Sequence, residues 1–247
     1  MKAFLLAAGK GTRLKPFTDH TPKCLIPIQG KPLLQIWIGL FETCGIQDVL
    51  INIHSHADQV LTWIEAYQPQ TPVHMTPFLE PRLLGSAGTL WARQDFVYDE
   101  DAFVIAYADN LTNINLERMI AFHRRTRLSG GMFTMGLFRS PNPAACGIAS
   151  LDSNYRILSF VEKPAQPESD LANAGIYVSS FEVFDRFPPN AGHFGHDVLD
   201  LGYHVLPNLT GNMFGYLIPE YIRDIGLPEA YLAAQSEWAE VNRKEQL

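Results

Sequence analysis

The first half of the chain alternates between strand-like and helix-like segments, and no other feature limits the possible folds more. Apolar runs typical of buried strands cover residues 2–8, 47–53, 73–76 and 103–108. Segments of helical character lie between them, at 32–44, 57–67 and 85–93. Within the first of these, Trp37 and Phe41 have the spacing of helix core residues. Strands and helices in this order form right-handed β-α-β units, so we expect a largely parallel sheet covered by helices.

Beyond Gly130 the pattern changes to strand-like runs with few helical segments between them. These runs cover residues 132–138, 147–151, 156–161, 172–179 and 213–218. The turn residues at 152–154 (DSN) separate the second run from the third and predict a hairpin. A closing helix is expected at 228–242, with Pro228 in its first turn. We therefore expect an α/β fold of the Rossmann-like, three-layer sandwich type, with a mostly parallel but mixed central sheet.

Composition and charge exclude several classes of protein. The 247 residues, 47% hydrophobic and 18% charged, suit one globular domain over 1–247 rather than a disordered or fibrous chain. The net charge of −7 argues against a general role on nucleic acid or an anionic membrane. The three cysteines form no C-x-x-C pair, and no stretch approaches about 18 consecutive apolar residues. We expect a cytoplasmic protein with no nucleic-acid or membrane partner, and a homo-oligomer stays open.

A glycine-rich loop at 9–14 (GKGTRL) follows the first strand directly. Glycines at such a place let backbone N–H groups approach a phosphate without obstruction by Cβ. The loop is neither the dinucleotide fingerprint, because Leu14 replaces the third glycine, nor a Walker A loop, because the G-x-x-x-x-G-K-[ST] spacing is absent. Basic residues flank it, namely Lys10, Arg13, Lys15 and Lys23. Taken alone, the loop is equally consistent with phosphate binding and with a turn carrying solvated cations.

Two histidine-containing stretches raise the question of a metal or ligand site. His54 and His56, with Asp58, follow a strand but have no fourth partner nearby in sequence, so satisfied loop histidines are the favoured interpretation. His193 and His196 lie in a glycine-rich stretch, where contact with a ligand and a purely structural role are equally supported.

Motifs spread over nearly the whole chain resemble those of sugar-1-phosphate nucleotidylyltransferases. In order they are 6–14 (LAAGKGTRL), 21–23 (TPK), 26–28 (IPI), 30–33 (GKPL), 84–90 (LGSAGTL), Asp109, 162–164 (EKP), 173–177 (NAGIY), 224–226 (DIG) and 228–229 (PE). Each motif alone is weak, but their number and order make the resemblance specific. It implies a nucleotide-binding part at about 1–110, a sugar-phosphate-binding part at about 111–227 and the closing helix.

The resemblance implies a reaction in which a sugar 1-phosphate attacks the α-phosphorus of a nucleoside triphosphate and pyrophosphate leaves. A phosphate monoester is already ionised, so such a reaction needs no general base. The protein must instead position two anions that repel each other and neutralise their charge. Cations and Mg²⁺ held by carboxylates suit that task.

The same resemblance assigns roles to individual charged residues. Arg13 stabilises the leaving pyrophosphate, Lys23 the α-phosphate, and Lys163 the sugar phosphate. Asp109 and Asp224 are the implied Mg²⁺ ligands. Taken singly, each carboxylate also fits a turn residue, and 162–164 fits a solvated strand end.

The resemblance also implies which residues contact the nucleotide and which contact the sugar. Nucleotide contacts fall to Ala8, Gly9, Gly11, Thr12, Gly85 and Gly88. Sugar contacts fall to Glu162, Asn173 and Gly175. Asn173 also fits a residue that satisfies buried backbone groups.

The sequence departs from the family pattern in two motifs, at 107–109 (YAD), where Asn-Gly-Asp is usual, and at Leu227. Ala108 stands where Gly is usual before the aspartate, which restricts how closely the backbone approaches a nucleotide, and Leu227 replaces a common Thr near the metal. These departures leave the efficiency and the substrate in question.

The nucleotide is inferred from 84–90, where the sequence resembles that of mannose-1-phosphate and heptose-1-phosphate guanylyltransferases and lacks the Gln typical of thymidylyltransferases. We expect GTP with mannose 1-phosphate or a close relative, giving a GDP-mannose or GDP-heptose type product. The alternatives are a uridylyl-, thymidylyl- or cytidylyltransferase and a non-catalytic regulator that binds nucleotide-sugars. A glycosyltransferase is disfavoured because 109–111 (DNL) lacks a second Asp.

Overall fold

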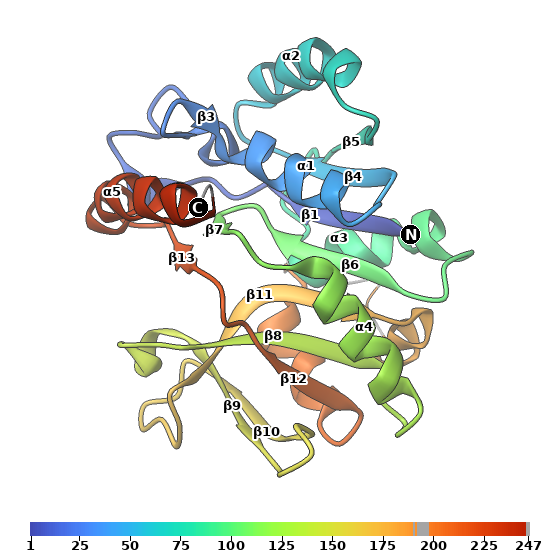
Figure 1. Cartoon of the computed structure of the whole chain (residues 1–247). Helices are drawn as coiled ribbons and strands as arrows, with labels where there is room; N and C mark the ends of the chain where they lie inside the picture. Colours follow the sequence, from blue (N-terminus) through green and yellow to red (C-terminus); the bar gives the residue numbers. More distant parts are fainter. Residues whose placement is uncertain (190, 192–197, 246–247) are drawn as a thin grey trace. The chain divides into compact units, whose positions relative to one another are not determined.

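The computed structural model describes residues 1–189, 191 and 198–245 (Figure 1). The chain forms two compact units, each made of several segments. The first unit consists of residues 1–4, 82–106 and 116–219, and the second of residues 5–81, 107–115 and 220–247. Strand β1 (Lys2–Leu6) passes from the first unit into the second. The single domain expected from the sequence stays a prediction.

The first unit is a mixed sheet with helices. Its strands are β6 (Phe103–Tyr107), β8 (Phe133–Arg139), β9 (Gly147–Leu151), β10 (Ile157–Glu162), β11 (Leu171–Ser179) and β12 (Met213–Leu217). Strand β11 pairs antiparallel with β6, β8 and β9, while β10 pairs antiparallel with β9 and β12 pairs parallel with β8. Its helices are α3 (Ser86–Ala92), α4 (Leu116–Arg127) and short turns at Gln94–Val97, Pro143–Ala145, Phe181–Arg186, Leu201–Val205 and Leu206–Leu209. The hairpin expected around 152–154 is confirmed by the β9–β10 pairing.

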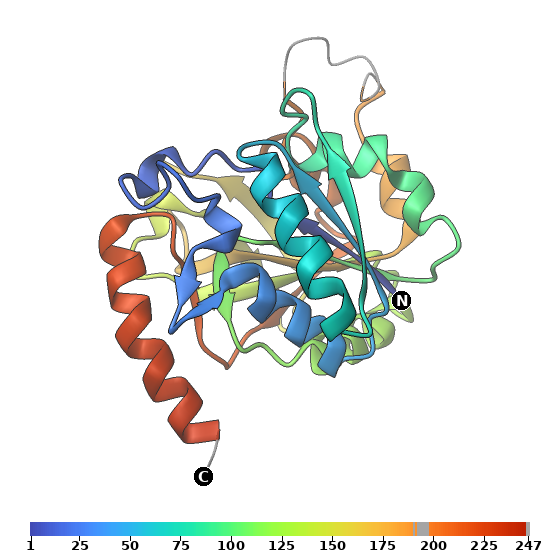
Figure 2. The same cartoon turned by 90° about the horizontal axis from the view of Figure 1, so that it is seen from above.

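The second unit combines the parallel pair of β4 and β5 with two small antiparallel sheets. Its strands are β2 (Pro27–Ile28), β3 (Lys31–Pro32), β4 (Asp48–Ile53), β5 (His74–Leu79), β7 (Asn110–Thr112) and β13 (Ile222–Asp224). Its helices are α1 (Leu33–Thr43), α2 (Ala57–Tyr67), α5 (Pro228–Glu245) and short turns at Thr12–Leu14, Lys23–Leu25 and Gln68–Gln70. Figure 2 shows α5 as one uninterrupted helix. Over the described ranges, no helix has both the length and the apolar character needed to cross a membrane.

Most elements agree with the sequence prediction. The helix at 57–67 and the strand at 147–151 match residue for residue, and the helix expected at 32–44 is α1. Trp37 and Phe41 are fully buried on α1 with ring centroids 5.7 Å apart, which confirms their role as core residues. Helix α4 was missed, although its buried residues Met119, Ile120 and His123 have helical spacing. The α/β class with a mixed sheet is confirmed.

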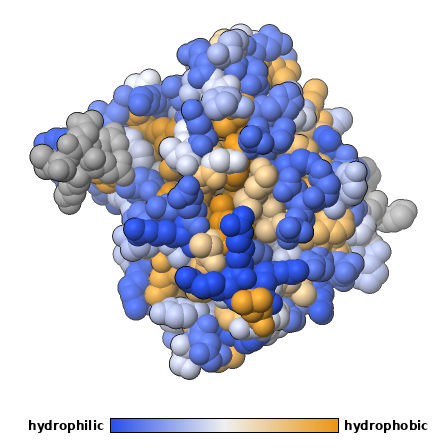
Figure 3. All heavy atoms as spheres, turned by 45° about the vertical axis from the view of Figure 1, so that its right-hand side comes forward, coloured by the Kyte–Doolittle hydropathy of each residue, from blue (hydrophilic) through white to orange (hydrophobic). Residues whose placement is uncertain are grey.

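The surface gives little guidance to function by hydropathy alone. Hydrophilic residues dominate the face drawn in Figure 3, with smaller apolar areas between them. Scattered apolar side chains are normal on protein surfaces, so they do not by themselves mark a site. The candidate site is therefore built from polar side chains.

Candidate functional site

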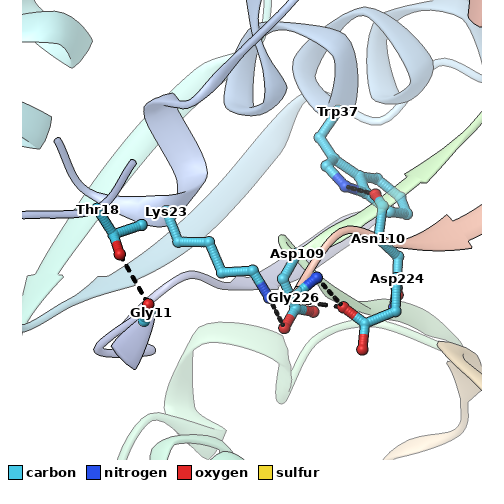
Figure 4. A network of polar contacts seen from close by, with 8 residues as sticks. All are labelled: Gly11, Thr18, Lys23, Trp37, Asp109, Asn110, Asp224 and Gly226. Carbon is cyan, nitrogen blue, oxygen red and sulfur yellow. Dashed lines mark hydrogen bonds and ion pairs between the residues drawn. The ribbon is translucent and has the colours of Figure 1, made fainter. Parts of the chain in front are cut away.

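Two acidic residues from distant parts of the chain come together in the second unit. Asp109 lies directly before β7, and Asp224 is the last residue of β13. The two strands pair antiparallel, with Asp224 opposite Asn110. Between the carboxylates lies Lys23, whose Nζ is 2.8 Å from Oδ2 of Asp109 and 3.6 Å from Oδ1 of Asp224 (Figure 4). The pairing of β7 with β13 thus creates a cluster that no local sequence pattern contains.

The charges in this cluster differ in exposure. The side chain of Lys23 is 8% exposed, whereas those of Asp109 and Asp224 are 37% and 53% exposed. A buried ammonium needs a partner of opposite charge, and both carboxylates supply it. The carboxylates themselves keep a solvent-facing side, so they remain accessible to a cation or a ligand.

Gly226 lies at the centre of the same cluster. Its backbone N–H donates to Oδ1 of Asp224 at 2.7 Å (Figure 4). A methyl group at this position would lie 3.1 Å from Nζ of Lys23 and 3.3 Å from Nη2 of Arg13. Arg13, Lys23 and Asp224 therefore converge around one glycine, and a side chain there would crowd all three.

Backbone hydrogen bonds hold the two acidic segments in place. The indole N–H of the buried Trp37 donates to the carbonyl of Asn110 at 2.9 Å (Figure 4). The backbone N–H of Ile225 donates to the carbonyl of Asp109 at 3.2 Å. Helical spacing predicts only a core role for Trp37, because it carries no information about a hydrogen bond to a residue 73 positions away.

The two glycines of the glycine-rich loop differ in their surroundings. Gly11 has a φ of 64°, and a Cβ there would lie 2.9 Å from Cγ2 of Thr18, whose hydroxyl donates to the Gly11 carbonyl. At Gly9, by contrast, nothing lies within 4 Å of the Cβ position. Thr12 and Arg13 are exposed at the start of the short helix that follows, and Ala8 is buried. The open approach to the backbone is therefore at Gly9.

Residues expected near the sugar gather in the first unit. Glu162, at the end of β10, lies opposite Gly147 of β9, and the next residue of β9 lies opposite Ala172 of β11. A Cβ at Gly147 or Gly202 would lie 2.5 or 2.7 Å from Oε2 of Glu162, so these glycines make room for the carboxylate. The register therefore brings Glu162 toward the strand that carries Asn173.

The carboxyl of Glu162 is in an unfavourable place for a negative charge. Burial raises the pKa of Glu162 above its ordinary value, and the carboxylate of Asp200 adds to the shift while Lys163 opposes it. Lys163 is exposed and has a φ of 50°, the left-handed region that few non-glycine residues adopt. Its backbone N–H donates to the carbonyl of Cys146. Glu162 and Lys163 are thus adjacent at the end of β10, and the backbone of Lys163 adopts the unusual conformation.

Asn173 and Gly175 form a β-bulge. The register between β11 and β8 shifts between Asn173 and Tyr177, and Gly175 has a φ of 66°. Oδ1 of Asn173 accepts the backbone N–H of Gly175 at 2.9 Å, and Nδ2 donates to the hydroxyl of Tyr177 at 2.7 Å. The prediction that Asn173 satisfies a backbone group is therefore confirmed. A sugar contact through the rest of the amide stays a prediction.

Gly85 and Gly88 pack against another part of the first unit. Gly85 has a φ of 83°, and a Cβ there would lie 2.5 Å from the carbonyl oxygen of Leu199. The backbone N–H of Gly88 donates to the same carbonyl at 3.0 Å, and the N–H of Leu199 donates to Leu84. These glycines are thus required by local packing, and their expected contact with the nucleotide stays a prediction.

The two departures from the family pattern have local structural roles. The N–H of the buried Ala108 donates to the carbonyl of Leu6 at 3.0 Å. The carbonyl of Leu227 accepts the N–H of Tyr231 in the first turn of α5, while its side chain is 41% exposed. Both positions hold site segments in place through backbone groups.

The histidines do not build a metal site in the parts of the chain that can be described. Nδ1 of His54 lies 2.9 Å from the carbonyl oxygen of Glu80, and His56 adopts a left-handed conformation before α2. Within the described residues no group of three or more His, Cys, Asp and Glu side chains could hold a metal ion. The stretch with His193 and His196 lies outside the described residues.

Comparison with known proteins assigns the chain to a family. Residues 2–241 match the nucleotidyl transferase family, and the chain belongs to that family. One relative is a UTP–glucose-1-phosphate uridylyltransferase of Synechocystis, 30% identical over 98% of this chain and 60% of the relative. Another is a mannose-1-phosphate guanylyltransferase of Mycobacterium tuberculosis, 29% identical over 95% of this chain and 64% of the relative. The chain thus spans less than two thirds of either relative.

A solved structure shows the same fold. HddC from Yersinia pseudotuberculosis, complexed with GMP-PN, superposes with a TM-score of 0.76 at 22% identity, over 96% of this chain and 99% of that one. The expected Rossmann-like α/β class is confirmed. The names of the two sequence relatives also confirm the expected sugar-1-phosphate nucleotidyltransferase family.

Proposed function

We propose that this protein transfers a nucleotidyl group from a nucleoside triphosphate to a sugar 1-phosphate and releases pyrophosphate. The observation that carries the proposal is the placement of Lys23 between Asp109 and Asp224, with Arg13 beside them. Membership of the nucleotidyl transferase family supports the reaction class. A protein that only bound a nucleotide-sugar would not need a cation for the leaving group, so Arg13 favours turnover.

Each charged residue acts on a different part of the two substrates. Lys23 neutralises the α-phosphate, and Arg13 stabilises the negative charge that develops on the departing pyrophosphate. Lys163 holds the sugar phosphate, whose ionised oxygen is the nucleophile, and Glu162 and Asn173 bind sugar hydroxyl groups. Because no proton must be removed from the nucleophile, the rate depends on positioning and charge neutralisation.

Asp109 and Asp224 fit Mg²⁺. They are carboxylates on adjacent strand ends, both near one ammonium and both partly exposed. Mg²⁺ is commonly held by one or two carboxylates together with substrate phosphates, so a pair of acidic residues is a sufficient protein contribution. When bound, the ion would neutralise phosphate charge.

We propose GTP as the nucleotide and mannose 1-phosphate, or a heptose 1-phosphate, as the acceptor. The sequence of 84–90 resembles that of guanylyltransferases, and the guanylyltransferase among the relatives supports this choice. The uridylyltransferase relative makes UTP with glucose 1-phosphate the principal alternative. A site built on hydrogen bonds to one base discriminates strongly, so we expect the preference to be large.

The test is pyrophosphate release by the purified protein across a grid of nucleoside triphosphates and sugar 1-phosphates with Mg²⁺ present. The proposal expects turnover that requires both substrates, with the highest kcat/KM for GTP and mannose 1-phosphate or a heptose 1-phosphate. A tenfold higher kcat/KM with UTP, dTTP or CTP would refute the nucleotide and keep the reaction class. Nucleotide-sugar binding without pyrophosphate release from any pair would identify a regulator instead.

A further inference from the structure

A buried polar chain in the second unit ends at the start of the glycine-rich loop. Oε1 of Glu80 accepts a hydrogen bond from Nδ2 of Asn52 at 2.8 Å. Oδ1 of Asn52 accepts the backbone N–H of Ala7 at 2.6 Å. Glu80 is 1% exposed and Asn52 is 4% exposed. A carboxylate and an amide are thus placed in the interior, next to the loop residues 7–9.

Three strand ends bring these residues together. Asn52 lies near the end of β4, Glu80 directly follows β5, and Ala7 directly follows β1. The parallel pairing of β4 with β5 fixes the relative position of Asn52 and Glu80, and the Glu80 N–H donates to the carbonyl of Ile53 at 2.8 Å. In α/β sheets, ligands bind at the carboxyl ends of strands, which is where this chain of contacts lies.

The two hydrogen bonds fix the orientation of the Asn52 amide. The NH₂ group of Asn52 is the part of the amide that can donate, and it faces Oε1 of Glu80. The carbonyl oxygen of the same amide must then face the opposite way, toward the N–H of Ala7. Glu80 therefore selects the one orientation of Asn52 that can hold the loop.

Stability alone gives a poor reason for such an arrangement. A carboxylate taken out of water is unfavourable unless it is fully hydrogen-bonded, and well-packed apolar residues often stabilise a core equally well. A defined loop backbone gives a better reason, because Ala8 and Gly9 follow Ala7 directly and Gly9 is the open position in this loop.

We propose that Asn52 and Glu80 are positioning residues for the nucleotide-binding loop, with Glu80 acting through Asn52. The inference rests on the proposed function in that the ligand of Ala8 and Gly9 is a nucleoside triphosphate. It predicts that removing the amide loosens residues 7–9 and weakens triphosphate binding, while sugar 1-phosphate binding stays unchanged.

The experiment first compares four single variants with the wild type. Asn52→Leu keeps the number and branching of the side-chain heavy atoms but removes the acceptor for Ala7. Glu80→Leu removes the group that orients the amide, whereas Glu80→Gln can still accept from Asn52 and is the conservative variant. Val49→Ala changes a buried apolar residue of β4, the strand that carries Asn52, and controls for simple loss of stability.

Two readouts separate loop positioning from catalysis. The first is amide hydrogen exchange of the peptide covering 7–9, which needs no ligand. The second is the dissociation constant for GTP and for mannose 1-phosphate by calorimetry. We expect faster exchange at 7–9 and about tenfold weaker GTP binding in Asn52→Leu and Glu80→Leu, the size expected for one lost hydrogen bond. We expect values within about threefold of wild type in Glu80→Gln and Val49→Ala.

The double variant Asn52→Leu/Glu80→Leu tests the order of action. If Glu80 acts through Asn52, the double variant binds GTP no more weakly than Asn52→Leu alone. Additive losses, or unchanged exchange at 7–9 in Asn52→Leu, would overturn the inference. Wild-type protein that binds no nucleoside triphosphate would instead contradict the proposed function, and the exchange data would still decide whether Asn52 holds the loop.

Discussion

The ammonium of Lys23 lies 2.8 Å from Oδ2 of Asp109, although the two residues are 86 positions apart in the chain. Because the side chain of Lys23 is 8% exposed, the ion pair is screened less by solvent than a pair on the open surface. Asp224 completes the arrangement from a second strand. A change at any one of the three residues therefore alters the charge balance of the whole cluster.

Neutralising either carboxylate should abolish metal-dependent turnover. We expect Asp109→Asn and Asp224→Asn to lower kcat by about 100-fold or more, and a chelator to remove wild-type activity until Mg²⁺ is restored. Pyrophosphate release measures the effect, and a thermal unfolding curve verifies folding. Asp95→Asn, at an exposed residue of the first unit, is the control and should stay active. Full activity in excess chelator would contradict the assignment.

Removing the ammonium should make the carboxylate pair a better cation site in the free protein. In Lys23→Met the two carboxylates lose their positive neighbour, so we expect the affinity for Mn²⁺ without nucleotide to rise about fivefold or more. Electron paramagnetic resonance of unbound Mn²⁺ provides the measurement. Lys15→Met removes an exposed ammonium that pairs with Asp19 and should leave the affinity unchanged. An equal or weaker affinity in Lys23→Met would show that the ammonium does not compete with the metal.

Arg13 and Lys163 should separate in steady-state kinetics. Arg13 acts on charge that develops as pyrophosphate leaves, so Arg13→Ala should chiefly lower kcat. Lys163 holds a charge already present on the substrate, so Lys163→Ala should chiefly raise the KM for the sugar 1-phosphate. Initial rates with each substrate varied in turn give both constants. A kinetically silent Arg13→Ala would exclude the glycine-rich loop from the reaction.

Acid should destabilise the first unit through His123. This fully buried histidine contacts Thr134 through Nδ1 and Ser180 through Nε2, and burial, reinforced by Arg127, lowers its pKa from 6.5 to about 4. The unfolded chain therefore takes up a proton at a pH where the folded protein does not. The titration of His123 therefore leaves the free energy of unfolding unchanged above about pH 6.5. As the pH drops toward 4 it lowers the free energy of unfolding, by about 2 kcal/mol at pH 5.

Denaturant unfolding at pH 7.5 and pH 5 measures this difference. In His123→Gln the free energy of unfolding should fall less between the two pH values, by about 2 kcal/mol, because the titrating group is gone. The seven other histidines are present in both proteins, so their contributions cancel in the comparison. If the free energy of unfolding had the same pH dependence in the two proteins, the pKa of His123 would not be lowered in the folded state.

Much of the local structure was predictable from the sequence. The helix at 57–67 and the strand at 147–151 follow from hydrophobic periodicity, and the helix that ends before Gly45 follows from a glycine stop with a φ of 73°. Ordered motifs also predicted the family, whereas the roles that they assign to Arg13 and Lys23 stay predictions. Helix α4 was not predicted, although its buried stripe and its charged exposed face form the amphipathic pattern of a surface helix.

The sequence alone determined individual helices and strands because hydrophobic periodicity and turn residues act over a few neighbouring positions. Only the tertiary structure placed Lys23 between Asp109 and Asp224, since that depends on the antiparallel pairing of β7 with β13. The same holds for the contact of Asn52 with Ala7, 45 positions away. Such contacts form only when packing of the whole unit brings distant strand ends together, so no window of neighbouring residues contains them.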